Sequence, residues 1–540
     1  MTAIKPAPSA PIAVAARAHG DDFPHRAGQA RIRLAGLLML ATLLFYSPWM
    51  LMSLNERYPW LAWPFAVANV FSIMYTVLVV SNAWSRSVPV RRRVGQGDEP
   101  HVGVIVTTCG EPVPMILRSV ISVLEQDWPA DRMAVVVSDD GHDPELAAAV
   151  AELPVVYHAP PPRFAPGRDG VAKAGNLNSA LALLDRQHPD LAYIETRDAD
   201  DEVGSHAFLR ETVGQLLADD HLAFVQTIKE AQVSAGDPFN NRETMFFRGQ
   251  MLARNAANAV FPCGSGLVWR RSALREIGDF PTWNLVEDVQ SGVEALRRGW
   301  RGLYLPIVGA VGQHCPEDIP SFYKQRGTWA IDTVRLMVWG GKQGLGLRQR
   351  LHFTEMLLFY LNAFTLLVYV PSVAFSLLGW TPLDASDAAY AEHLLPLVVI
   401  TEIWLLTLNH PFNDRRRRQR RPVAALWRQR IMVAGLAPIY MKAAAQAVLS
   451  GPNRKPVYQV TRKMTDPRRW HWLLTLPQTG VVVLTVAFAI YAVSAGTLPG
   501  FWPMAATLYW AGLNIFLLSG FVTRGWYGVQ RSRRGASSTP

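Results

Sequence analysis

The chain has 540 residues, half of them hydrophobic, with 18 tryptophans and 22 phenylalanines, and it carries a formal net charge of +10. Its mean hydropathy of +0.09 is typical of long apolar spans joined to a polar region. The basic residues fall in short runs beside the apolar segments, which indicates membrane orientation rather than nucleic-acid binding. Three cysteines far apart in sequence, Cys109, Cys263 and Cys315, predict neither a disulfide framework nor a zinc site.

The first 90 residues predict a tail followed by a membrane hairpin. Residues 1–30 are rich in Ala and Pro without periodicity, so we expect a disordered cytosolic tail there. Two apolar stretches, 34–54 and 60–84, are each long enough to cross a hydrocarbon core of about 30 Å. Arginines precede the first stretch and follow the second at 91–93, so both ends of the hairpin are expected in the cytosol.

Residues 100–310 show a different pattern, in which short β-branched runs alternate with amphipathic segments such as PMILRSVISVLEQ. The expected strands are VGVIVTT, MAVVVSDD, PVVY, LAYIETRDAD and LAFVQTIK. Continuous apolar strands of this kind predict a parallel sheet covered on both faces, and hence an α/β nucleotide-binding domain. In such sheets ligands bind beyond the carboxyl ends of the strands.

The membrane pattern returns after residue 350. Two basic flanks, 415–421 and the segment after the last span, are predicted to be cytosolic, and six spans in all satisfy every basic flank. The segment 431–449 is apolar but carries Lys442 and Gln446, so we expect an interfacial helix rather than a seventh span. The four later spans are expected at 353–378, 394–408, 473–493 and 502–522.

Paired carboxylates follow one of the expected strands. Asp198 and Asp200 close LAYIETR, and in an extended backbone residues two apart point the same way. Such a pair suits Mg²⁺ or Mn²⁺, which bind through one or two carboxylates and the oxygens of a phosphate. A solvated loop after a strand is the alternative interpretation.

Two further groups suggest nucleotide binding. Asp139 and Asp140 end the strand MAVVVS, where a carboxylate can accept hydrogen bonds from a base or ribose, although an ordinary turn is the alternative. Lys173 begins an expected helix, where a cation and free backbone N–H groups favour a diphosphate. A helix cap alone would explain Asn176 or Asn178, but not the neighbouring lysine.

Glu287 and Asp288 begin another expected helix after a loop. One carboxylate at such a position is commonly only a cap. Sugar transfer with inversion, however, requires a base that takes the proton from an acceptor hydroxyl, and a carboxylate can do this.

Seven motifs in order resemble those of the cellulose-synthase-like, processive glycosyltransferases of family 2. They are TTCGEP (107–112), SDDG (138–141), KAGNLN (173–178), DAD (198–200), FPCGSG (261–266), VED (286–288) and QRGTW (325–329). The resemblance implies a GT-A fold, a Rossmann-like α/β domain inserted in a multi-pass helical membrane domain, with a UDP-sugar donor and a glycan acceptor.

The resemblance also carries roles onto matching residues. Asp288 would be the general base, and Asp198 and Asp200 would hold Mg²⁺ or Mn²⁺. Contacts to the nucleotide and diphosphate are implied for Thr107, Glu111, Asp139, Asp140, Lys173 and Asp198, and contacts to the acceptor for Cys263, Gly264, Ser265 and Glu287.

The motif Q-x-x-R-W of the family is altered in this chain. Gln325 and Trp329 match, but Thr328 replaces the arginine that would bind the donor diphosphate. Arg326 is the nearest substitute, yet a helix turns it about 200° away from residue 328. Trp329 offers a flat face on which a sugar can stack, and a place in an interfacial aromatic belt is the alternative.

The resemblance continues into the segment after 455. Tyr458, Thr461 and Lys463 match the F-x-V-T-x-K gating loop of bacterial cellulose synthases, with Tyr in place of Phe, and a chance basic loop is the alternative. The cyclic-di-GMP-binding PilZ domain of those synthases is not expected here. The expected organisation is a tail at 1–30, a hairpin at 31–90, a cytosolic GT-A domain at 95–315, interfacial helices at 316–350, two spans at 351–410, a basic loop with the interfacial helix and gating-like loop at 411–470, two spans at 471–523 and a cytosolic tail at 524–540.

The leading hypothesis is therefore an inner-membrane synthase that extends a β-linked polysaccharide from a UDP-sugar and moves it through its own helices. UDP-glucose is the favoured donor, a periplasmic accessory subunit is a candidate partner, and nucleic acid is not. A non-processive transferase that places one sugar on a lipid carrier is the second hypothesis. A membrane transporter whose soluble domain senses nucleotides is the third.

Overall fold

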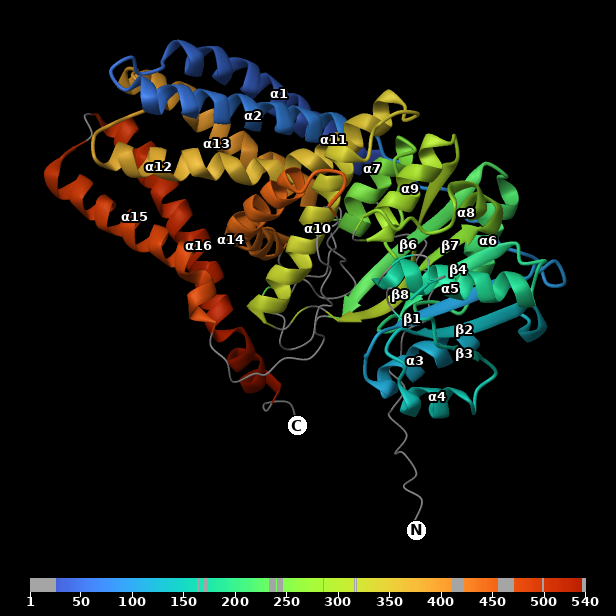
Figure 1. Cartoon of the computed structure of the whole chain (residues 1–540). Coiled ribbons are helices and arrows are strands. Elements are labelled where there is room, and N and C mark those ends of the chain that lie inside the picture. Colours follow the sequence, from blue (N-terminus) through green and yellow to red (C-terminus); the bar gives the residue numbers. More distant parts are fainter. Residues whose placement is uncertain are drawn as a thin grey trace.

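The computed structural model describes residues 26–540 except 163–164, 167, 169, 171, 233–238, 240–245, 285, 315, 317, 410–421, 455–470, 498–499 and 537–540. It consists of an α/β domain and a bundle of long helices, with the α/β domain beside one end of the bundle (Figure 1). The tail 1–25 and the segment containing Tyr458, Thr461 and Lys463 therefore lie outside the described residues.

Within the described residues, eight strands form one mixed sheet in the order β3-β2-β1-β4-β7-β6-β8-β5. Each strand expected from the sequence is present. Three strands were not expected, namely β5, β7 and β8. The bounds are β1 (Val102–Thr108), β2 (Met133–Asp139), β3 (Val156–His158), β4 (Tyr193–Asp198), β5 (Glu202–Val203), β6 (Leu222–Gln232), β7 (Leu267–Arg270) and β8 (Arg301–His314).

The prediction of a parallel sheet is correct for β1 to β4 and for the pair of β6 and β8, and wrong at β7 and β5. Strand β7 pairs antiparallel with both β4 and β6. Thr196 lies opposite Leu267, so the loop that enters β7, residues 261–266, lies at the carboxyl edge of β4. This reversal of direction is what brings the FPCGSG motif to the edge where ligands bind.

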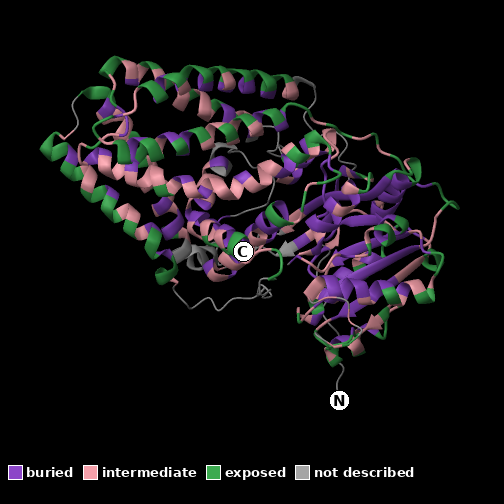
Figure 2. Cartoon of the chain, turned by 45° about the horizontal axis from the view of Figure 1, so that its top comes forward, coloured by how far each residue is buried: buried purple, intermediate pink, exposed green. Residues whose placement is uncertain are grey.

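Apolar residues on alternate positions of the strands pack into two cores, one on each face of the sheet. Ile105 and Ile194 belong to one core, while their neighbours Val104, Val106 and Tyr193 belong to the other. The central strands β1, β4 and β7 are accordingly almost wholly buried, as Figure 2 shows, whereas the edge strands β3 and β5 are not. The covering helices are α3 (Val113–Leu124), α4 (Pro144–Val150), α5 (Ala172–Gln187), α6 (Phe208–Ala218), α7 (Met251–Ala256), α8 (Arg271–Ile277) and α9 (Glu287–Arg297), with short turns η1 (Ala130–Arg132) and η2 (Phe246–Gln250).

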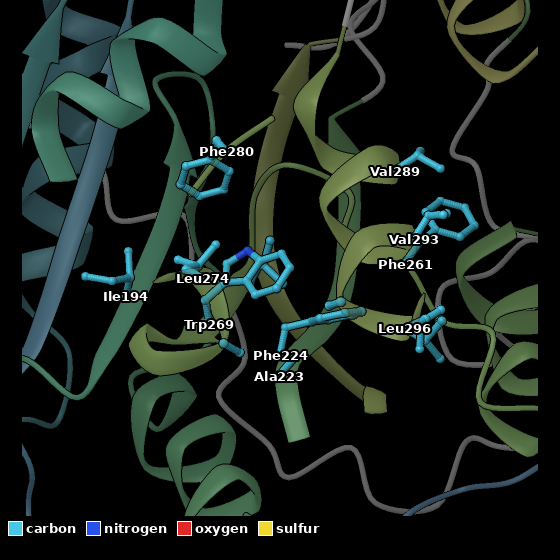
Figure 3. Close-up of a cluster of buried hydrophobic side chains, with 14 of the residues drawn as sticks. Ile194, Ala223, Phe224, Phe261, Trp269, Leu274, Phe280, Val289, Val293 and Leu296 are labelled. Carbon is cyan, nitrogen blue, oxygen red and sulfur yellow. The ribbon is translucent and has the colours of Figure 1, made fainter. Parts of the chain in front are cut away.

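Helix α9 is fixed to the first of these cores by its apolar side. Val289, Val293 and Leu296 are buried in the same cluster as Phe224 and Trp269 (Figure 3). Burial of aliphatic side chains of this size is worth about 1.5–3 kcal/mol each. The first turn of α9 is thereby held in place against the sheet.

Seven helical segments of the described chain are long and apolar enough to cross a membrane, which makes the chain a membrane protein. The outer faces of the bundle carry many exposed residues (Figure 2). The helices are α1 (Arg26–Met52), α2 (Pro59–Ala83), α11 (Leu347–Leu361) with η3 (Asn362–Thr365) and α12 (Leu366–Leu377), α13 (Asp387–Asn409), α14 (Pro422–Leu449), η5 (Trp472–Thr475) with α15 (Leu476–Ala495), and α16 (Phe501–Ala536).

All six expected spans are present, and the fourth is longer than expected because α13 begins at Asp387. The seventh candidate is Leu426–Leu449, in α14. Half of its most apolar window is buried, compared with 44% for Gly28–Met52 and 17% for Trp472–Ala495. It packs on α10 (Ile319–Trp339), where Tyr440 shares a cluster with Phe322. Length and composition thus allow seven spans, and an interfacial position for 431–449 stays a prediction.

Candidate active site

The carboxyl ends of the parallel strands bring the first motifs together. In the sheet register Thr107 lies opposite both Ser138 and Asp198, and Thr108 lies opposite Asp139. Asn176 of α5 joins this edge, since its side chain accepts from the hydroxyl of Ser138 and donates to the backbone carbonyls of Ser138 and Thr108. The start of α5, which carries Lys173, is therefore held above the ends of β1 and β2.

Lys173 and Asp198 form the centre of the site. The ammonium group of Lys173 donates to Oδ1 of Asp198 and to the carbonyl of Gly264 at 2.9 Å, and lies 3.6 Å from Oε1 of Glu287. Burial opposes the charged form of Lys173, but Asp198 and Glu287 outweigh burial and raise the pKa of the ammonium above its ordinary value. Lys173 therefore carries a fixed positive charge, and a positive charge is what binding of a diphosphate requires.

The prediction that Asp198 and Asp200 share one face of a strand is wrong in its geometry. Strand β4 ends at Asp198, and the carbonyl of Asp198 accepts from the N–H of Asp201 at 3.0 Å, so the chain turns there. Asp200 is buried in this turn, and Asp201 is fully buried. The turn replaces the expected pair with a compact run of three acidic residues.

The loop 261–266 closes one side of the site. The backbone N–H of Asp198 donates to the hydroxyl of Ser265 at 3.2 Å, and the N–H of Cys263 donates to the side chain of Gln226 at 2.7 Å. Gly264 has a φ of +76°, and a Cβ there would lie 2.9 Å from the ammonium of Lys173. Only glycine fits that approach without strain. Of the four residues expected near the acceptor, Gly264 and Ser265 thus contact the Lys173 and Asp198 pair, and Cys263 lies in the same loop.

Asp288 lies in the first turn of α9, one residue after the buried Glu287. Its Oδ1 accepts from the N–H of Val289 at 2.7 Å. Burial first, and then the neighbouring Glu287, raises the pKa of Asp288 from 3.8 to about 7, although Lys173 opposes this rise. A half-buried carboxyl group with a pKa near neutrality is suited to take up a proton at physiological pH.

Helix α10 holds the loop that precedes α9 and Asp288. The carboxylate of Asp332 accepts from the N–H of Val286 at 2.9 Å, and Arg335 donates to the carbonyl of Trp283 at 2.7 Å. The guanidinium of Arg335 also lies over the ring of Trp283, 3.9 Å from its centre. Pro452, just beyond α14, accepts from both Trp283 and Arg335. The loop before α9 is therefore tied to the helices near the membrane.

Asp139 and Asp140 are engaged within the protein. Asp139 is fully buried and accepts from the N–H groups of Gly141 and Asp143 and from the hydroxyl of Tyr157 at 3.0 Å. Burial and this hydrogen bond raise the pKa of Tyr157 to about 12. Asp140 forms an ion pair at 2.6 Å with Arg168, whose side chain is almost fully buried. These contacts shape the turn after β2.

The first motif builds a turn next to β1. Glu111 accepts from the hydroxyl of Thr108 at 2.9 Å and from the N–H of Cys109 at 2.6 Å. Thr107 is buried, and its hydroxyl lies 3.4 Å from the carbonyl of Arg197. The structure thus places Thr107 and Glu111 at the edge of the sheet where the site lies.

The altered motif QRGTW lies on α10. Arg326 is buried and lies over the rings of Trp329 and Phe322, at 4.6 and 5.2 Å from their centres. The hydroxyl of Thr328 donates to the carbonyl of Lys324 in the same helix. Gln325 and Trp329 are half-buried. No cation stands at position 328, and Arg326 is engaged with aromatic rings.

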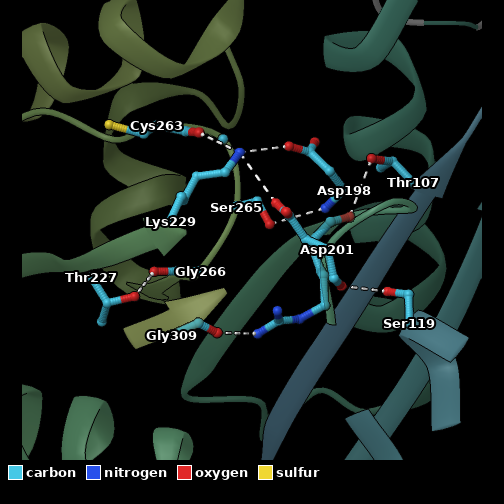
Figure 4. Close-up of polar contacts among 12 residues, drawn as sticks. Thr107, Ser119, Asp198, Asp201, Thr227, Lys229, Cys263, Ser265, Gly266 and Gly309 are labelled. Atoms are coloured by element: carbon cyan, nitrogen blue, oxygen red, sulfur yellow. Dashed lines mark hydrogen bonds and ion pairs between the residues drawn. The ribbon is translucent and has the colours of Figure 1, made fainter. Parts of the chain in front are cut away.

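Lys229 is the main site residue that the sequence did not suggest. It lies in β6, and its ammonium group contacts Asp198 at 2.9 Å and Asp201 at 3.2 Å (Figure 4). The one charged residue in the expected strand LAFVQTIK was the available signal. Tyr157 and Arg168 were also missed, and nothing in their sequence surroundings distinguishes them.

An α/β domain with acidic residues at its strand ends, beside a membrane bundle, is the architecture of a glycosyltransferase with a GT-A fold. The family model described as "Glycosyl transferase family 2" matches residues 103–278, and "Glycosyl transferase family group 2" matches 193–401. Together they span more than half of the chain. The chain belongs to glycosyltransferase family 2, and it is cellulose-synthase-like.

Curated relatives agree with this assignment. A cellulose synthase catalytic subunit of Pseudomonas fluorescens is 28% identical over 69% of this chain and 51% of its own length. Cellulose synthase 1 of Komagataeibacter xylinus is 30% identical over 55% of this chain and 19% of its own. The chain thus spans about half or less of these relatives. A solved mannosyltransferase of Pyrobaculum calidifontis, in complex with GDP-Man and Mn²⁺, aligns over 71% of this chain and 99% of its own at 19% identity, with a TM-score of 0.48.

Proposed function

We propose that the chain is an inverting glycosyltransferase of the bacterial inner membrane that transfers a hexose from a UDP-sugar to a growing β-linked polysaccharide. The catalytic domain lies in the cytosol, and the product passes through the helix bundle. The observation that carries the proposal is the position of Asp288. Its carboxyl group, with a pKa of about 7, lies beside Glu287, which contacts Lys173 of the Lys173 and Asp198 pair.

The residues support direct displacement at the anomeric carbon. Asp288 takes the proton of an acceptor hydroxyl as its oxygen forms the new bond to the anomeric carbon. The bond from that carbon to the donor diphosphate breaks, and the electron pair leaves with the diphosphate. Lys173 stabilises the negative charge that develops on the leaving diphosphate. One displacement inverts the configuration, so an α-linked donor gives a β-linked product.

A divalent cation fits the charge of this site. The site has an excess of negative charge, because five carboxylates lie near only two ammonium groups, those of Lys173 and Lys229. The carboxylates are those of Asp198, Asp200, Asp201, Glu287 and Asp288. Their oxygens are ligands that Mg²⁺ and Mn²⁺ prefer. Among the described residues no group of three or more candidate ligands is assembled, so Asp198 and Asp200 would hold the ion together with phosphate oxygens. The bound ion would neutralise the leaving diphosphate.

The junction with the membrane supports transfer to a glycan. Trp329 is half-buried on α10, the helix whose Asp332 and Arg335 hold the loop before Asp288. An indole ring can stack on the apolar face of a sugar. Pro452, which accepts from Trp283 and Arg335, precedes the segment of Tyr458, Thr461 and Lys463 by a few residues. A role for that segment next to the donor is proposed on the resemblance. Glucose is the favoured sugar on resemblance, and a periplasmic accessory subunit would receive the product.

Two other functions remain as candidates. A non-processive transferase is favoured by Thr328, since its hydroxyl is bonded to its own helix and supplies no charge to a diphosphate. A transporter with a nucleotide-sensing domain is allowed by the seven apolar helices. A sensor, however, has no use for a carboxyl group of raised pKa at the start of α9.

The Asp288→Asn variant separates enzyme from sensor. We expect it to lose sugar transfer while it still binds UDP, because Lys173 and Asp198 are unchanged. Asp220→Asn is the matched control, since the side chain of Asp220 is 92% exposed. Transfer retained by the Asp288 variant would exclude the enzyme mechanism. Product length on a gel then separates polymerisation from addition of a single sugar.

A further inference from the structure

Lys229 is a buried cation at the centre of the site. It comes from β6, its side chain is 4% exposed, and its ammonium group has three acidic or carbonyl neighbours (Figure 4). The ammonium donates to Oδ2 of Asp198 at 2.9 Å and to the carbonyl of Cys263 at 3.4 Å, and lies 3.2 Å from Oδ2 of Asp201. Lys229 therefore joins the end of β4 to the loop that borders the acceptor side.

Asp198 is held by two ammonium groups, one on each oxygen. Oδ1 faces Lys173 and Oδ2 faces Lys229. The two lysines differ in exposure, because the side chain of Lys173 is 26% exposed and that of Lys229 only 4%. Lys173 can thus exchange its contact with Asp198 for a phosphate of the donor. Lys229 has no comparable access to solvent.

A divalent cation would have to compete with these contacts. A metal ion binds carboxylate lone pairs that the ammonium groups use as hydrogen-bond acceptors. A fixed positive charge within a few ångström also repels a second cation, and little water is present to screen that repulsion. Lys229 therefore lies against the same carboxylate groups that a metal ion would approach.

We propose that Lys229 is a built-in cation that competes with the divalent metal for Asp198 and makes metal binding depend on the donor nucleotide. The proposal rests on the proposed function, since it concerns the metal of that reaction. Without nucleotide, the two lysines neutralise Asp198 and metal affinity is low. When a diphosphate is bound, its oxygens supply the remaining ligands and attract Lys173 away from Asp198. Lys229 stays on Oδ2 of Asp198 and beside Asp201, so its charge continues to oppose a metal ion at Oδ1.

Metal binding measured without turnover tests this role. Free Mn²⁺ is titrated by electron paramagnetic resonance against the purified full chain in detergent, with and without UDP. Lys229→Gln and Lys229→Met remove the charge, and Lys229→Arg retains it. Lys342→Met, outside the site, is the matched control for loss of a lysine. Thermal unfolding shows which variants are folded, and the milder Gln variant serves if the Met variant is not.

We expect loss of the charge to tighten Mn²⁺ binding in the absence of UDP by about tenfold or more, and to shrink the gain that UDP gives. Lys229→Arg and Lys342→Met should behave as the wild type does. Unchanged or weaker Mn²⁺ binding by a folded Gln or Met variant would overturn the proposal.

Failure of the proposed function would give a different pattern in the same Mn²⁺ titrations. If UDP does not promote Mn²⁺ binding in the wild type, while the uncharged variants bind Mn²⁺ tightly, the competition for Asp198 is supported, but the dependence on the nucleotide and the proposed metal of the reaction are refuted. If neither the wild type nor the variants bind Mn²⁺ under any condition, both are overturned. Asp198→Asn identifies the site, because it should remove the Mn²⁺ binding gained in Lys229→Gln.

Discussion

Replacement of Asp288 by Asn should make the protein inactive and more stable at the same time. The variant keeps the size of the side chain and removes only its charge. Burial and Glu287 raise the pKa of Asp288 from 3.8 to about 7, so the folded protein disfavours the ionised form. At pH 8 that cost is at most about 4 kcal/mol, since each pKa unit is worth about 1.4 kcal/mol. Contact of the half-buried group with solvent reduces this figure.

The sign of the pH dependence follows from the direction of the shift. Between about pH 4 and pH 7 the folded chain retains a proton that the unfolded chain has lost, so the free energy of unfolding falls as the pH rises. At pH 5 the cost is about 2 kcal/mol, and above pH 7 it is complete. The Asn variant lacks this cost. Its stabilisation relative to the wild type should therefore be larger at pH 8 than at pH 5.

Two measurements test this reasoning together. Thermal unfolding of the two proteins at pH 5 and pH 8 should show an advantage for Asp288→Asn that grows by several degrees with pH. Transfer by the wild type should rise with pH and level off above about pH 7, whereas the variant should lose transfer on the order of 10²- to 10⁴-fold. An equal stability gap at both pH values, with transfer independent of pH, would refute the account of Asp288.

Three further predictions concern neighbouring residues. Asp198→Asn should abolish transfer and weaken Mn²⁺ binding in the presence of UDP, whereas Asp220→Asn, measured in parallel, should alter neither. Gly264→Ala should lower the transfer rate about tenfold, because the residue has a φ of +76° and the new Cβ would contact the ammonium group of Lys173. Gly299→Ala is the control: Gly299 also has a positive φ, but nothing lies near its Cβ position, so this variant should keep the wild-type rate. Equal transfer rates for the two variants would contradict the argument. Burial, and then the charge of Asp288, raises the pKa of the Cys263 thiol. Mass spectrometry should therefore show little alkylation of Cys263 by iodoacetamide at pH 8. Rapid alkylation would show instead that the thiol is ionised.

Much of the fold could be predicted because its strands are continuous apolar runs. Strands β1, β2, β4 and β6 have this pattern. The membrane helices could be predicted because their apolar stretches are longer than the core of an ordinary soluble domain requires. Strand β7 has only four residues, too few to show a period. Strand β8 is interrupted by Gly302, Gly309 and Gly312 and has irregular register with β6, so its pattern is weak.

The site could be predicted where function depends on position along one element. Asp198 ends a strand, and Lys173 and Asp288 each lie in the first turn of a helix, which are places where ligands bind. The turn after Asp198 could not be predicted, because its backbone conformation is set by the contacts of the acidic residues with the sheet. The contact of Lys229 with Asp198 depends on the order of strands, which pairwise contacts between distant segments decide.

The most direct test of the proposed function is sugar incorporation by membranes that contain the full chain. Membranes are incubated with a panel of labelled UDP-sugars and Mg²⁺ or Mn²⁺, and the product is sized and digested with linkage-specific hydrolases. We predict that one UDP-hexose gives a labelled polymer that a β-specific hydrolase degrades, and that membranes with Asp288→Asn give none. No incorporation from any donor, by a chain that binds UDP, would contradict the account.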